Sequence, residues 1–426
     1  MNITEAQEWL SGFQQFGMNL GLKRIHFLMD HLNHPEKNYP IVHVAGTNGK
    51  GSVCRFIASI LKTAGYRVGV YTSPHLQTVF ERFSINDKMI SKKDFAEVAA
   101  KVKPAVDHLI ETGEQPTYFE VCTVMMFHFF ALKQVDVAVI EVGLGGRYDA
   151  TNIVDPLVAV ITNVSKDHQQ VLGIEIEDIA AEKAGIIKKN RPVVTAATGI
   201  ALEVIQKKAS TLNAPVRVIS NENSQFIEKN IQGQQIHCTG WLDSYTVTTS
   251  SLGNFQQQNI ALAITAVEVL QIQGLYVPEE AIIPGIEHMH HPGRMQILQK
   301  EPLVLIDGAH NERAMKVLFE SIKDLFSEKK IIMILGLLHD KDIFNITKII
   351  AENADMVIIT KPVSHRAENP EIIAEHLRNH QYDKPIKIAA DIQQAIHLGL
   401  KEAKKTDLIL VAGSLYLLAA ALESFN

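Results

Sequence analysis

The chain has 426 residues, with 41 Lys and Arg against 47 Asp and Glu, which gives a formal net charge of −6. This acidic balance excludes a protein that binds nucleic acid mainly through positive charge, because a polyanion attracts a basic surface. Hydrophobic residues make up 46% of the chain and charged residues 21%, a composition that supports large cores and excludes a disordered chain. At about 150 residues per domain, the length predicts two or three domains.

The first part of the chain predicts an α/β fold. From Tyr39 onward, short β-branched runs alternate with amphipathic stretches of helical length, the pattern of a parallel sheet with helices on both faces. The predicted strands are continuously apolar, as strands covered on both faces are. They are residues 41–45, 68–71, 137–142, 158–163 and 192–196. The stretch 224–251 alternates Thr, Tyr and Val and predicts a β-meander or hairpins.

A domain boundary is expected behind two predicted helices, 255–273 and 278–289. The segment His290-His291-Pro292-Gly293-Arg294 follows them, and its Pro and Gly interrupt regular structure. Beyond it, strand and helix patterns alternate again, with predicted strands at 303–306, 331–335, 356–360, 386–389 and 408–411. We therefore predict a parallel-sheet domain with a phosphate loop over residues 1–295 and a smaller Rossmann-like α/β domain over residues 296–426.

A glycine-rich loop follows the first predicted strand. It reads Gly46-Thr47-Asn48-Gly49-Lys50-Gly51-Ser52 and leads into a helix-compatible stretch, 53–63. Backbone N–H groups at a helix N-terminus point at phosphate oxygens, and a lysine adds a cation. The loop departs from the general phosphate-loop pattern, because its first Gly is only three residues before Gly49 and Gly51 separates Lys50 from Ser52. A glycine-rich turn formed by chance is the alternative, but the strand and helix around the loop favour nucleotide binding.

This loop resembles that of the ATP-dependent amide ligases that comprise the cell-wall Mur ligases and the folylpolyglutamate synthases. The form with Gly before Ser is most similar to the folate branch. Further matching motifs follow in chain order: Ser73-Pro74-His75-Leu76, Glu81-Arg82, Thr117-Tyr118-Phe119-Glu120, residues 141–152, Asp167-His168, residues 182–186, Pro292-Gly293-Arg294 and residues 307–311. They cover nearly the whole chain, and by their order and spacing it is identified as a member of the bacterial folylpolyglutamate synthase/dihydrofolate synthase family.

An ATP-dependent ligase needs hard oxygen ligands for Mg²⁺ beside the phosphates, and the ends of parallel strands supply them. Glu141 ends an apolar strand, where an isolated carboxylate is costly to bury. The resemblance implies that Ser73 and Glu141 hold one Mg²⁺ and that His168 helps to hold a second. From the residues alone, a salt-bridged structural acid at Glu141 and a hydrogen-bonded structural histidine at His168 remain alternatives.

Lys183 lies two residues before Gly185, where a predicted helix ends. Its composition alone predicts an ordinary surface lysine. The resemblance implies instead that CO₂ carbamylates this lysine, which turns a cation into a carboxylate-like anion that supports the second metal. A lysine with a lowered pKa can react in this way, because the neutral amine is the nucleophile. With Lys50 and His168, Lys183 forms the expected catalytic set.

The resemblance also implies three further nucleotide contacts. Asn259 lies early on an apolar predicted helix and corresponds to an asparagine that contacts adenine. Arg294 and Asp307 flank the predicted boundary, and by resemblance this Arg reaches phosphate and this Asp the ribose region. An exposed linker cation is the alternative for Arg294.

The predicted acceptor site starts at Thr117-Tyr118-Phe119-Glu120, which opens an apolar helix. Phe119 can stack on a flat heteroaromatic ring, and Arg147 and Asp149 can hydrogen-bond a pterin or benzoate group; a core role is the alternative for Phe119. The resemblance places a pteroate site here; its remaining members are Thr117, Glu120, Ala150, Met18, Asn19 and Leu20. Met18 and Asn19 stand where dihydropteroate-using members have Ile and Asp, which favours polyglutamylation over dihydrofolate synthesis. His310 and Ser414 are candidates for holding the incoming glutamate.

The implied activity is a magnesium-dependent ATP ligase that adds L-glutamate to dihydropteroate, to tetrahydrofolate and folylpolyglutamates, or to both kinds of acceptor, through an acyl phosphate. A Mur-type ligase with another carboxylate substrate is one alternative, although such enzymes carry an extra N-terminal domain of order 100 residues and only 45 residues precede Gly46. A nucleotide-dependent switch without ligase activity is the other; it leaves the second domain and the lysine motif unexplained.

No apolar run approaches the roughly 18 residues of a membrane span, and the N-terminus lacks the basic and apolar regions of a secretory signal. Three scattered cysteines suit a reducing compartment. We expect a cytoplasmic protein without a membrane or nucleic-acid partner. The absence of a coiled-coil pattern predicts a monomer.

Overall fold

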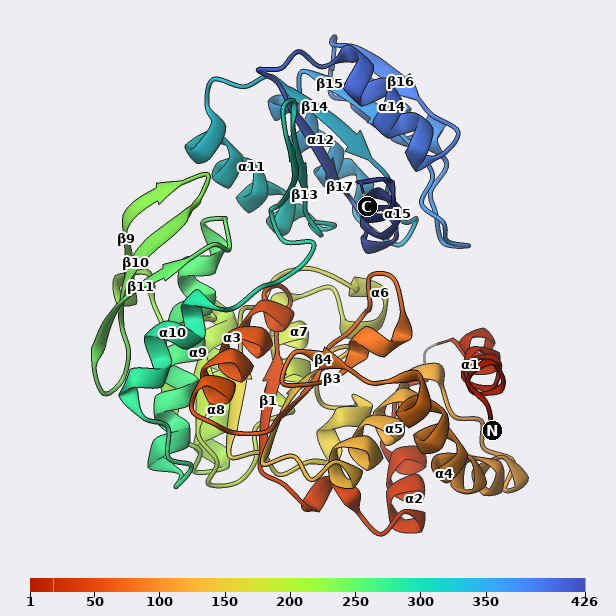
Figure 1. The fold of residues 1–426 in the computed structure, drawn as a ribbon, viewed down its shortest axis with the longest axis vertical. Helices are drawn as coiled ribbons and strands as arrows, with labels where there is room; N and C mark the ends of the chain where they lie inside the picture. The colour runs from red at the N-terminus through yellow and green to blue at the C-terminus, as the bar shows by residue number, and fades with distance from the viewer. Residues whose placement is uncertain (18, 426) are drawn as a thin grey trace. The chain divides into compact units, whose positions relative to one another are not determined.

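The computed structural model describes residues 1–17 and 19–425, and the chain forms two compact units (Figure 1). The first comprises Met1–Gln225, Ile236–Val247 and Gln258–Met289. The second comprises Phe226–Gln235, Thr248–Gln257 and His290–Asn426. Each has its own sheet and its own buried core, and the predicted α/β class is confirmed.

The first unit is built on an eight-stranded sheet with the order β4-β3-β2-β5-β1-β6-β7-β8. Its strands are β1 (Ile41–Ala45), β2 (Val68–Tyr71), β3 (Phe83–Ile85), β4 (Lys88–Met89), β5 (Val137–Glu141), β6 (Val158–Ile161), β7 (Val193–Thr195) and β8 (Val216–Val218). Six strands run parallel, whereas β3 and β4 extend the sheet as antiparallel edge strands. The central strand β1 is buried along its whole length, as its apolar sequence predicts.

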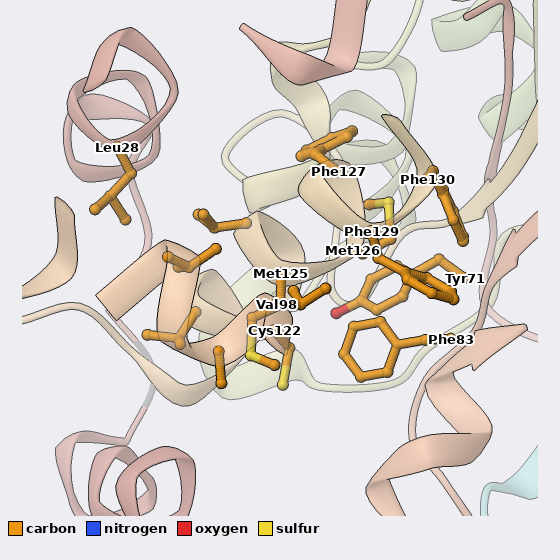
Figure 2. Close-up of a cluster of buried hydrophobic side chains, with 14 of the residues drawn as sticks. Leu28, Tyr71, Phe83, Val98, Cys122, Met125, Met126, Phe127, Phe129 and Phe130 are labelled. Carbon is orange, nitrogen blue, oxygen red and sulfur yellow. The ribbon is translucent and has the colours of Figure 1, made fainter. Parts of the chain in front are cut away.

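Helices enclose this sheet with two separate apolar clusters. They are α1 (Ile3–Ser11), α2 (Lys23–His31), α3 (Lys50–Thr63), α4 (Lys92–Glu111), α5 (Tyr118–Leu132), α6 (Gln169–Leu172), α7 (Ile176–Ala184), α8 (Gly199–Thr211), α9 (Phe255–Ile272) and α10 (Ile282–Glu287). Helix α5 is apolar around most of its circumference and is buried along most of its length. Figure 2 shows its labelled side chains pointing in several directions from the helix: Cys122, Met125, Met126, Phe127, Phe129 and Phe130.

The N-terminus of α5 is fixed by a capping box. The Thr117 hydroxyl accepts a hydrogen bond from the Glu120 N–H at 3.1 Å, and the Thr117 N–H donates to the Glu120 carboxylate at 2.7 Å. Two N–H groups that a helix end leaves without partners are thereby satisfied. This cap fixes the first turn of α5 and therefore the position of the Phe119 side chain.

A three-stranded sheet follows, in the order β11-β10-β9. Its strands are β9 (Ser224–Asn230), β10 (Gly233–Thr239) and β11 (Ser244–Thr249), so the predicted meander over 224–251 is confirmed. Buried and exposed residues alternate along β11, as in a strand with one covered face.

The second unit contains a six-stranded sheet with the order β12-β13-β17-β14-β15-β16. Its strands are β12 (Gln296–Lys300), β13 (Leu303–Ile306), β14 (Ile331–Leu335), β15 (Met356–Ile359), β16 (Ile386–Ile388) and β17 (Leu408–Ala412). The helices are α11 (Glu312–Phe326), α12 (Ile343–Asn353), α13 (Pro370–Asn379), α14 (Ile392–Glu402) and α15 (Leu415–Phe425). The last strand, β17, lies between β13 and β14 and runs parallel to both.

The strand β12 was not predicted, because its sequence Gln-Ile-Leu-Gln-Lys is polar at three of five positions and pairs antiparallel only with β13 at the sheet edge. The five other strands of this sheet are confirmed. No helix within residues 1–17 and 19–425 combines the length and the hydropathy that a membrane span requires.

Candidate active site

The glycine loop leaves β1 at Ala45 and enters α3 at Lys50, as the strand–loop–helix pattern predicts. Gly49 caps α3 in the left-handed region, with φ 84°. A Cβ at Gly49 would overlap the Asn259 amide, and one at Gly46 would overlap the Thr162 hydroxyl. Glycine at both positions therefore lets neighbouring chain approach the loop closely. The structure brings the predicted nucleotide residue Asn259 directly against the loop.

The polar end of β6 holds the loop in place. The Asn48 N–H donates to the Asn163 side chain at 3.1 Å, and the Asn48 carbonyl accepts from the Asn163 amide at 2.9 Å and from the Thr162 hydroxyl at 2.6 Å. Thr47 adds a bond from its hydroxyl to the Ser165 carbonyl. Sequence analysis missed Thr162 and Asn163 as positioning residues; the signal was two polar residues closing an apolar strand.

Lys50, Gly51 and Ser52 form the first turn of α3, at the positive end of the helix dipole. The Lys50 ammonium donates to the carbonyls of Gly46 and Thr47 at 3.2 and 3.3 Å. The side chain thus folds over its own loop, and its charge sits beside the backbone N–H groups that cradle an anion.

Lys183 reaches the same loop from the last turn of α7. Its ammonium donates to the Gly46 carbonyl at 3.0 Å, and the residue is only 3% exposed. Burial, followed by the nearby charge of Lys50, lowers the pKa of Lys183 to about 7, although Asp167 and Glu182 oppose the shift. The interpretation of Lys183 as an ordinary surface lysine is therefore wrong: the helix end is packed into the site. A substantial neutral fraction at neutral pH makes its amine available as a nucleophile.

Glu141 ends β5, where the sheet register sets it opposite Val44 of the central strand. It is buried, and its carboxylate accepts the Ser73 N–H at 3.0 Å. A carboxylate and a hydroxyl at adjacent strand ends are the hard oxygen donors that Mg²⁺ takes. Within residues 1–17 and 19–425, no group of three or more His, Cys, Asp or Glu side chains is arranged to hold a metal ion.

His168 lies on the loop after β6, where it precedes α6 with φ 51°. Its backbone N–H donates to the Asp167 carboxylate at 2.9 Å, and its ring Nε2 lies 3.9 Å from the same carboxylate. A left-handed conformation is uncommon for a residue other than glycine. The ring is half-buried, and Asp167 is close enough to raise the pKa of Lys183.

The acceptor wall is formed where α5 meets the glycine-rich segment after β5. A Cβ at Gly143 would overlap the Phe119 ring, which also lies 6.0 Å from the Tyr71 ring, centroid to centroid. Glycine at this position therefore lets the outer edge of the aromatic ring come close to the backbone. Phe119 is only partly buried, at the edge of the apolar cluster.

Asp149 stabilises the segment after β5 through hydrogen bonds to its own neighbours. Its carboxylate accepts the Leu144 N–H at 2.8 Å, and the Thr151 N–H and hydroxyl at 3.0 and 2.5 Å. Thr151 in turn meets the buried ring of His43 at 2.8 Å. Burial raises the pKa of Asp149, against the hydrogen bonds it accepts. Ala150 starts the short helix that Asp149 caps and is also buried.

Arg147 is exposed and lies on the α7 side of the same segment. Its backbone N–H donates to the Glu182 carbonyl at 2.8 Å, and its guanidinium lies 3.8 Å from the Glu182 carboxylate. Gly185 packs against the Arg147 backbone. The helix that carries Lys183 and the loop that carries Arg147 are thereby fixed to each other.

A buried ion pair connects the N-terminal segment to α5. The Arg24 Nε donates to both carboxylate oxygens of Glu120 at 3.0 and 3.1 Å, and Arg24 Nη2 donates to the Asn19 carbonyl at 2.5 Å. Glu120 is therefore bound by protein groups, and Arg24 is a positioning residue that sequence analysis missed. Leu20 is 40% exposed. Met18 lies outside the described residues.

In the second unit, Asp307 follows β13 and is buried. Its two carboxylate oxygens accept the N–H groups of Met295 and Ala309 at 2.9 and 2.8 Å. Burial raises the pKa of Asp307, and the guanidinium of Arg294 opposes this rise. Arg294 is half-buried against Gly308, where a Cβ would meet its guanidinium. The interpretation of Arg294 as an exposed linker cation is therefore wrong.

His310 and Ser414 follow the neighbouring strands β13 and β17, and the Gly413 N–H joins these loops by donating to the Ala309 carbonyl at 2.9 Å. His310 Nδ1 lies 2.7 Å from the Gly308 carbonyl, and the buried Ser414 hydroxyl accepts the Leu417 N–H at 3.2 Å. The structure thus brings Asp307, His310 and Ser414 to the same edge of the second sheet.

Comparison with known proteins gives two family matches, the Mur ligase middle domain over residues 44–267 and the Mur ligase glutamate ligase domain over residues 293–415. The chain is 37% identical to the dihydrofolate synthase/folylpolyglutamate synthase of Bacillus subtilis, over 97% of each chain. It is 33% identical to the Escherichia coli protein of the same description, over 97% of this chain and 94% of that one.

Solved structures agree with these matches. The folylpolyglutamate synthase of Mycobacterium tuberculosis complexed with ADP superposes with a TM-score of 0.92 and 30% identity, over 100% of this chain and 98% of that one. An E. coli protein solved in complex with DHPP and ADP gives a TM-score of 0.88 and 31% identity, over 99% and 97%. The chain therefore belongs to the Mur ligase family, in the branch of the dihydrofolate and folylpolyglutamate synthases.

Proposed function

We propose that the protein is an ATP-dependent ligase that joins L-glutamate to dihydropteroate, to tetrahydrofolate and folylpolyglutamates, or to both kinds of acceptor. The observation that carries the proposal is the meeting of three features at one edge of the first sheet: the phosphate loop with Lys50, the Glu141–Ser73 pair, and the buried Lys183. The shared descriptions of its relatives support the same activity.

In the proposed reaction, the acceptor carboxylate attacks the γ-phosphorus of ATP, so that an acyl phosphate forms and ADP leaves. The glutamate amine then attacks the acyl carbon, and phosphate departs from the tetrahedral intermediate. Lys50 and the loop N–H groups stabilise charge on the transferring phosphoryl group, because phosphoryl transfer is mainly positioning and electrostatics. Glu141 and Ser73 would hold one Mg²⁺ and His168 would help to hold a second, and these ions would neutralise phosphate charge.

Lys183 has a proposed role in its modified form. Its neutral amine can add to CO₂ with loss of a proton, which leaves a carbamate anion close to the loop. Burial supports this reaction, because it lowers the pKa of the amine to about 7. A ¹³C-bicarbonate label should give a carbamate resonance in the protein that is absent from the Lys183→Ala variant; equal spectra would contradict the modification.

The remaining assignments follow the resemblance and the geometry. Asn259, against Gly49, is proposed to contact adenine, and Arg294 and Asp307 to contact phosphate and ribose. Phe119 and Asp149, with the segment around Asn19, form the proposed pteroate site, and His310 and Ser414 the glutamate site. We also propose domains of residues 1–295 and 296–426, and a cytoplasmic monomer.

The test is ADP release with Mg²⁺ and ATP, with dihydropteroate and L-glutamate added separately and together, and then with tetrahydrofolate as acceptor. Release that needs dihydropteroate and glutamate establishes dihydrofolate synthesis, and release that needs tetrahydrofolate and glutamate establishes polyglutamylation. ADP release that depends on neither acceptor contradicts the proposal and favours a nucleotide switch or another ligase substrate.

A further inference from the structure

Arg82 is a buried cation with neutral surroundings. It ends the short 3₁₀ helix η3 (Val79–Arg82) and is only 8% exposed. Its Nε donates to His75 Nδ1 at 2.9 Å, and its guanidinium carbon lies 5.5 Å from the centre of the Tyr118 ring. Tyr71 and Cys122 are its other close neighbours.

The comparison with Arg24 brings out what is unusual here. Arg24 is buried to a similar degree, at 7% exposed, but it donates to both oxygens of the Glu120 carboxylate. Within residues 1–17 and 19–425, no carboxylate forms an ion pair of 4 Å or less with Arg82. A guanidinium stays charged in proteins, and a buried charge is costly unless an opposite charge compensates it. A ligand can supply the anion that the described part of the protein does not.

The position of Arg82 indicates which anion this is. The loop that begins at Thr72 ends at Arg82, and the two ends meet because the Thr72 N–H donates to the Arg82 carbonyl at 3.3 Å. The next residue, Ser73, contacts Glu141. On its other side, Arg82 lies over Tyr118, the neighbour of Phe119 in the acceptor wall. Arg82 thus adjoins both the phosphate side and the aromatic side of the site.

We propose that Arg82 binds the carboxylate of the acceptor substrate, the group that receives the phosphoryl group. The planar guanidinium matches a carboxylate with two parallel hydrogen bonds, a geometry that an ammonium cannot reproduce. This inference rests on the proposed function and names the side chain that recognises the reacting group.

The loop does not depend on Arg82 alone for its shape. The Glu81 carboxylate accepts the N–H groups of Leu76, Gln77 and Thr78 at 2.8, 2.8 and 2.6 Å. Phe83, the next residue, anchors β3 in the core, where Figure 2 shows its ring beside that of Tyr71. The backbone around Arg82 is therefore held from both sides, and a variant at this position can keep its fold.

The experiment compares the binding of dihydropteroate with that of its carboxamide analogue, which has the same rings but a neutral amide. Isothermal titration is carried out on the wild type, on Arg82→Gln and on Arg67→Gln, an exposed arginine of the same unit, as the control. We expect the wild type and the control to bind the carboxylate roughly 10- to 100-fold more tightly than the amide, the range for charge-assisted hydrogen bonds. Arg82→Gln should bind the two ligands equally, with its ATP affinity within about twofold of the wild type.

Arg82→Lys keeps the charge and should retain part of the preference for the carboxylate. The inference is overturned if Arg82→Gln keeps the full preference, or if it loses affinity for both ligands in equal measure, as a merely structural residue would. Acceptor-dependent ADP release by the wild type is measured on the same preparation. If ADP release by the wild type depends on the acceptor and Arg82→Gln still prefers the carboxylate fully, the role of Arg82 is wrong but the proposed function stands. If ADP release by the wild type does not depend on the acceptor, the proposed function is wrong as well.

Discussion

The buried charged groups at the carboxyl edges of the two sheets are compensated in different ways. In the first unit, the Lys183 ammonium lies at the Gly46 carbonyl with a second cation, Lys50, close by, and its pKa falls to about 7. In the second unit, the Asp307 carboxylate receives two backbone N–H groups and faces Arg294. The first arrangement concentrates positive charge around a loop that is shaped for an anion. The second neutralises its charge within the protein.

This difference predicts where substitutions act. A charge that awaits a ligand contributes little to the apo fold and much to turnover, because its partner arrives with the substrate. A charge that is satisfied by the protein's own N–H groups contributes to stability, because its removal leaves buried donors without acceptors. The following four variants test that division.

The largest effect is expected for Lys50→Ala. We expect kcat/KM for ADP release to fall about 1000-fold, because the variant removes a cation aimed at the transferring phosphoryl group. Thermal unfolding should stay within a few degrees of the wild type, since the ammonium bonds that the variant removes are those to loop carbonyls. Lys62→Ala, on the same helix and paired only with Asp87 at the surface, is the control. Near-normal turnover of the Lys50 variant would exclude its role.

Glu141→Gln should lower turnover roughly 100-fold and raise the Mg²⁺ concentration needed for half-maximal rate. The amide oxygen of Gln can still accept the Ser73 N–H, so the loop geometry is kept while the negative charge is lost. A magnesium titration of ADP release measures the effect. An unchanged magnesium requirement would favour the structural interpretation of Glu141.

Asp307→Asn tests the other sheet and should reduce the free energy of unfolding by about 1–3 kcal/mol. Asn offers one oxygen where the carboxylate accepts two N–H groups, so either Met295 or Ala309 loses its acceptor. Urea denaturation of the apo protein measures this loss. If stability is unchanged and only the KM for ATP rises, Asp307 serves only the ribose contact proposed above, and the contrast between the two sheets fails.

At neutral pH the smallest effect is expected for His43, which shows how a buried group avoids carrying a charge. Burial, with a contribution from Lys188, lowers the pKa of His43 from 6.5 to about 3. Between these two values the unfolded chain binds a proton that the folded chain excludes. The free energy of unfolding should therefore fall by roughly 1.4 kcal/mol per pH unit as the pH drops from 6.5 towards 3, with no contribution above 6.5.

The His43→Gln variant should lack this part of the acid sensitivity. Urea denaturation at pH 7, 5.5 and 4.5 compares the slopes of the two proteins. Parallel slopes would mean that His43 is protonated in the folded state or that the unfolded state does not bind the proton.

The sequence predicts most of the fold, because strands that are buried on both faces have continuously apolar sequences. The strands that escaped prediction are β3, β4 and β8, at the two ends of the first sheet, and β12, at the edge of the second. The first three have only two or three residues each, and β12 is polar. The position of β17 between two earlier strands also escaped, since strand order depends on packing between segments that are distant in the chain.

The site was predictable in its motifs and not in its contacts. The phosphate loop and Glu141 stand out by local pattern, and the structure places Asn259 against the loop as a neighbour. The burial of Lys183 depends on how α7 packs, and no local pattern records it. The same holds for the pairing of Arg24 with Glu120, which are separated by 96 positions. The functional roles of these residues stay predictions.

The placement of β17 affects how the second sheet can assemble during synthesis. Its residues Leu408–Ala412 pair with β13 on one side and with β14 on the other, so the sheet has no continuous centre until the ribosome has passed position 412. Before that point, β12–β13 and β14–β16 form two fragments, each with an apolar edge open to other chains. A nascent or truncated chain that ends before residue 408 is accordingly an aggregation hazard.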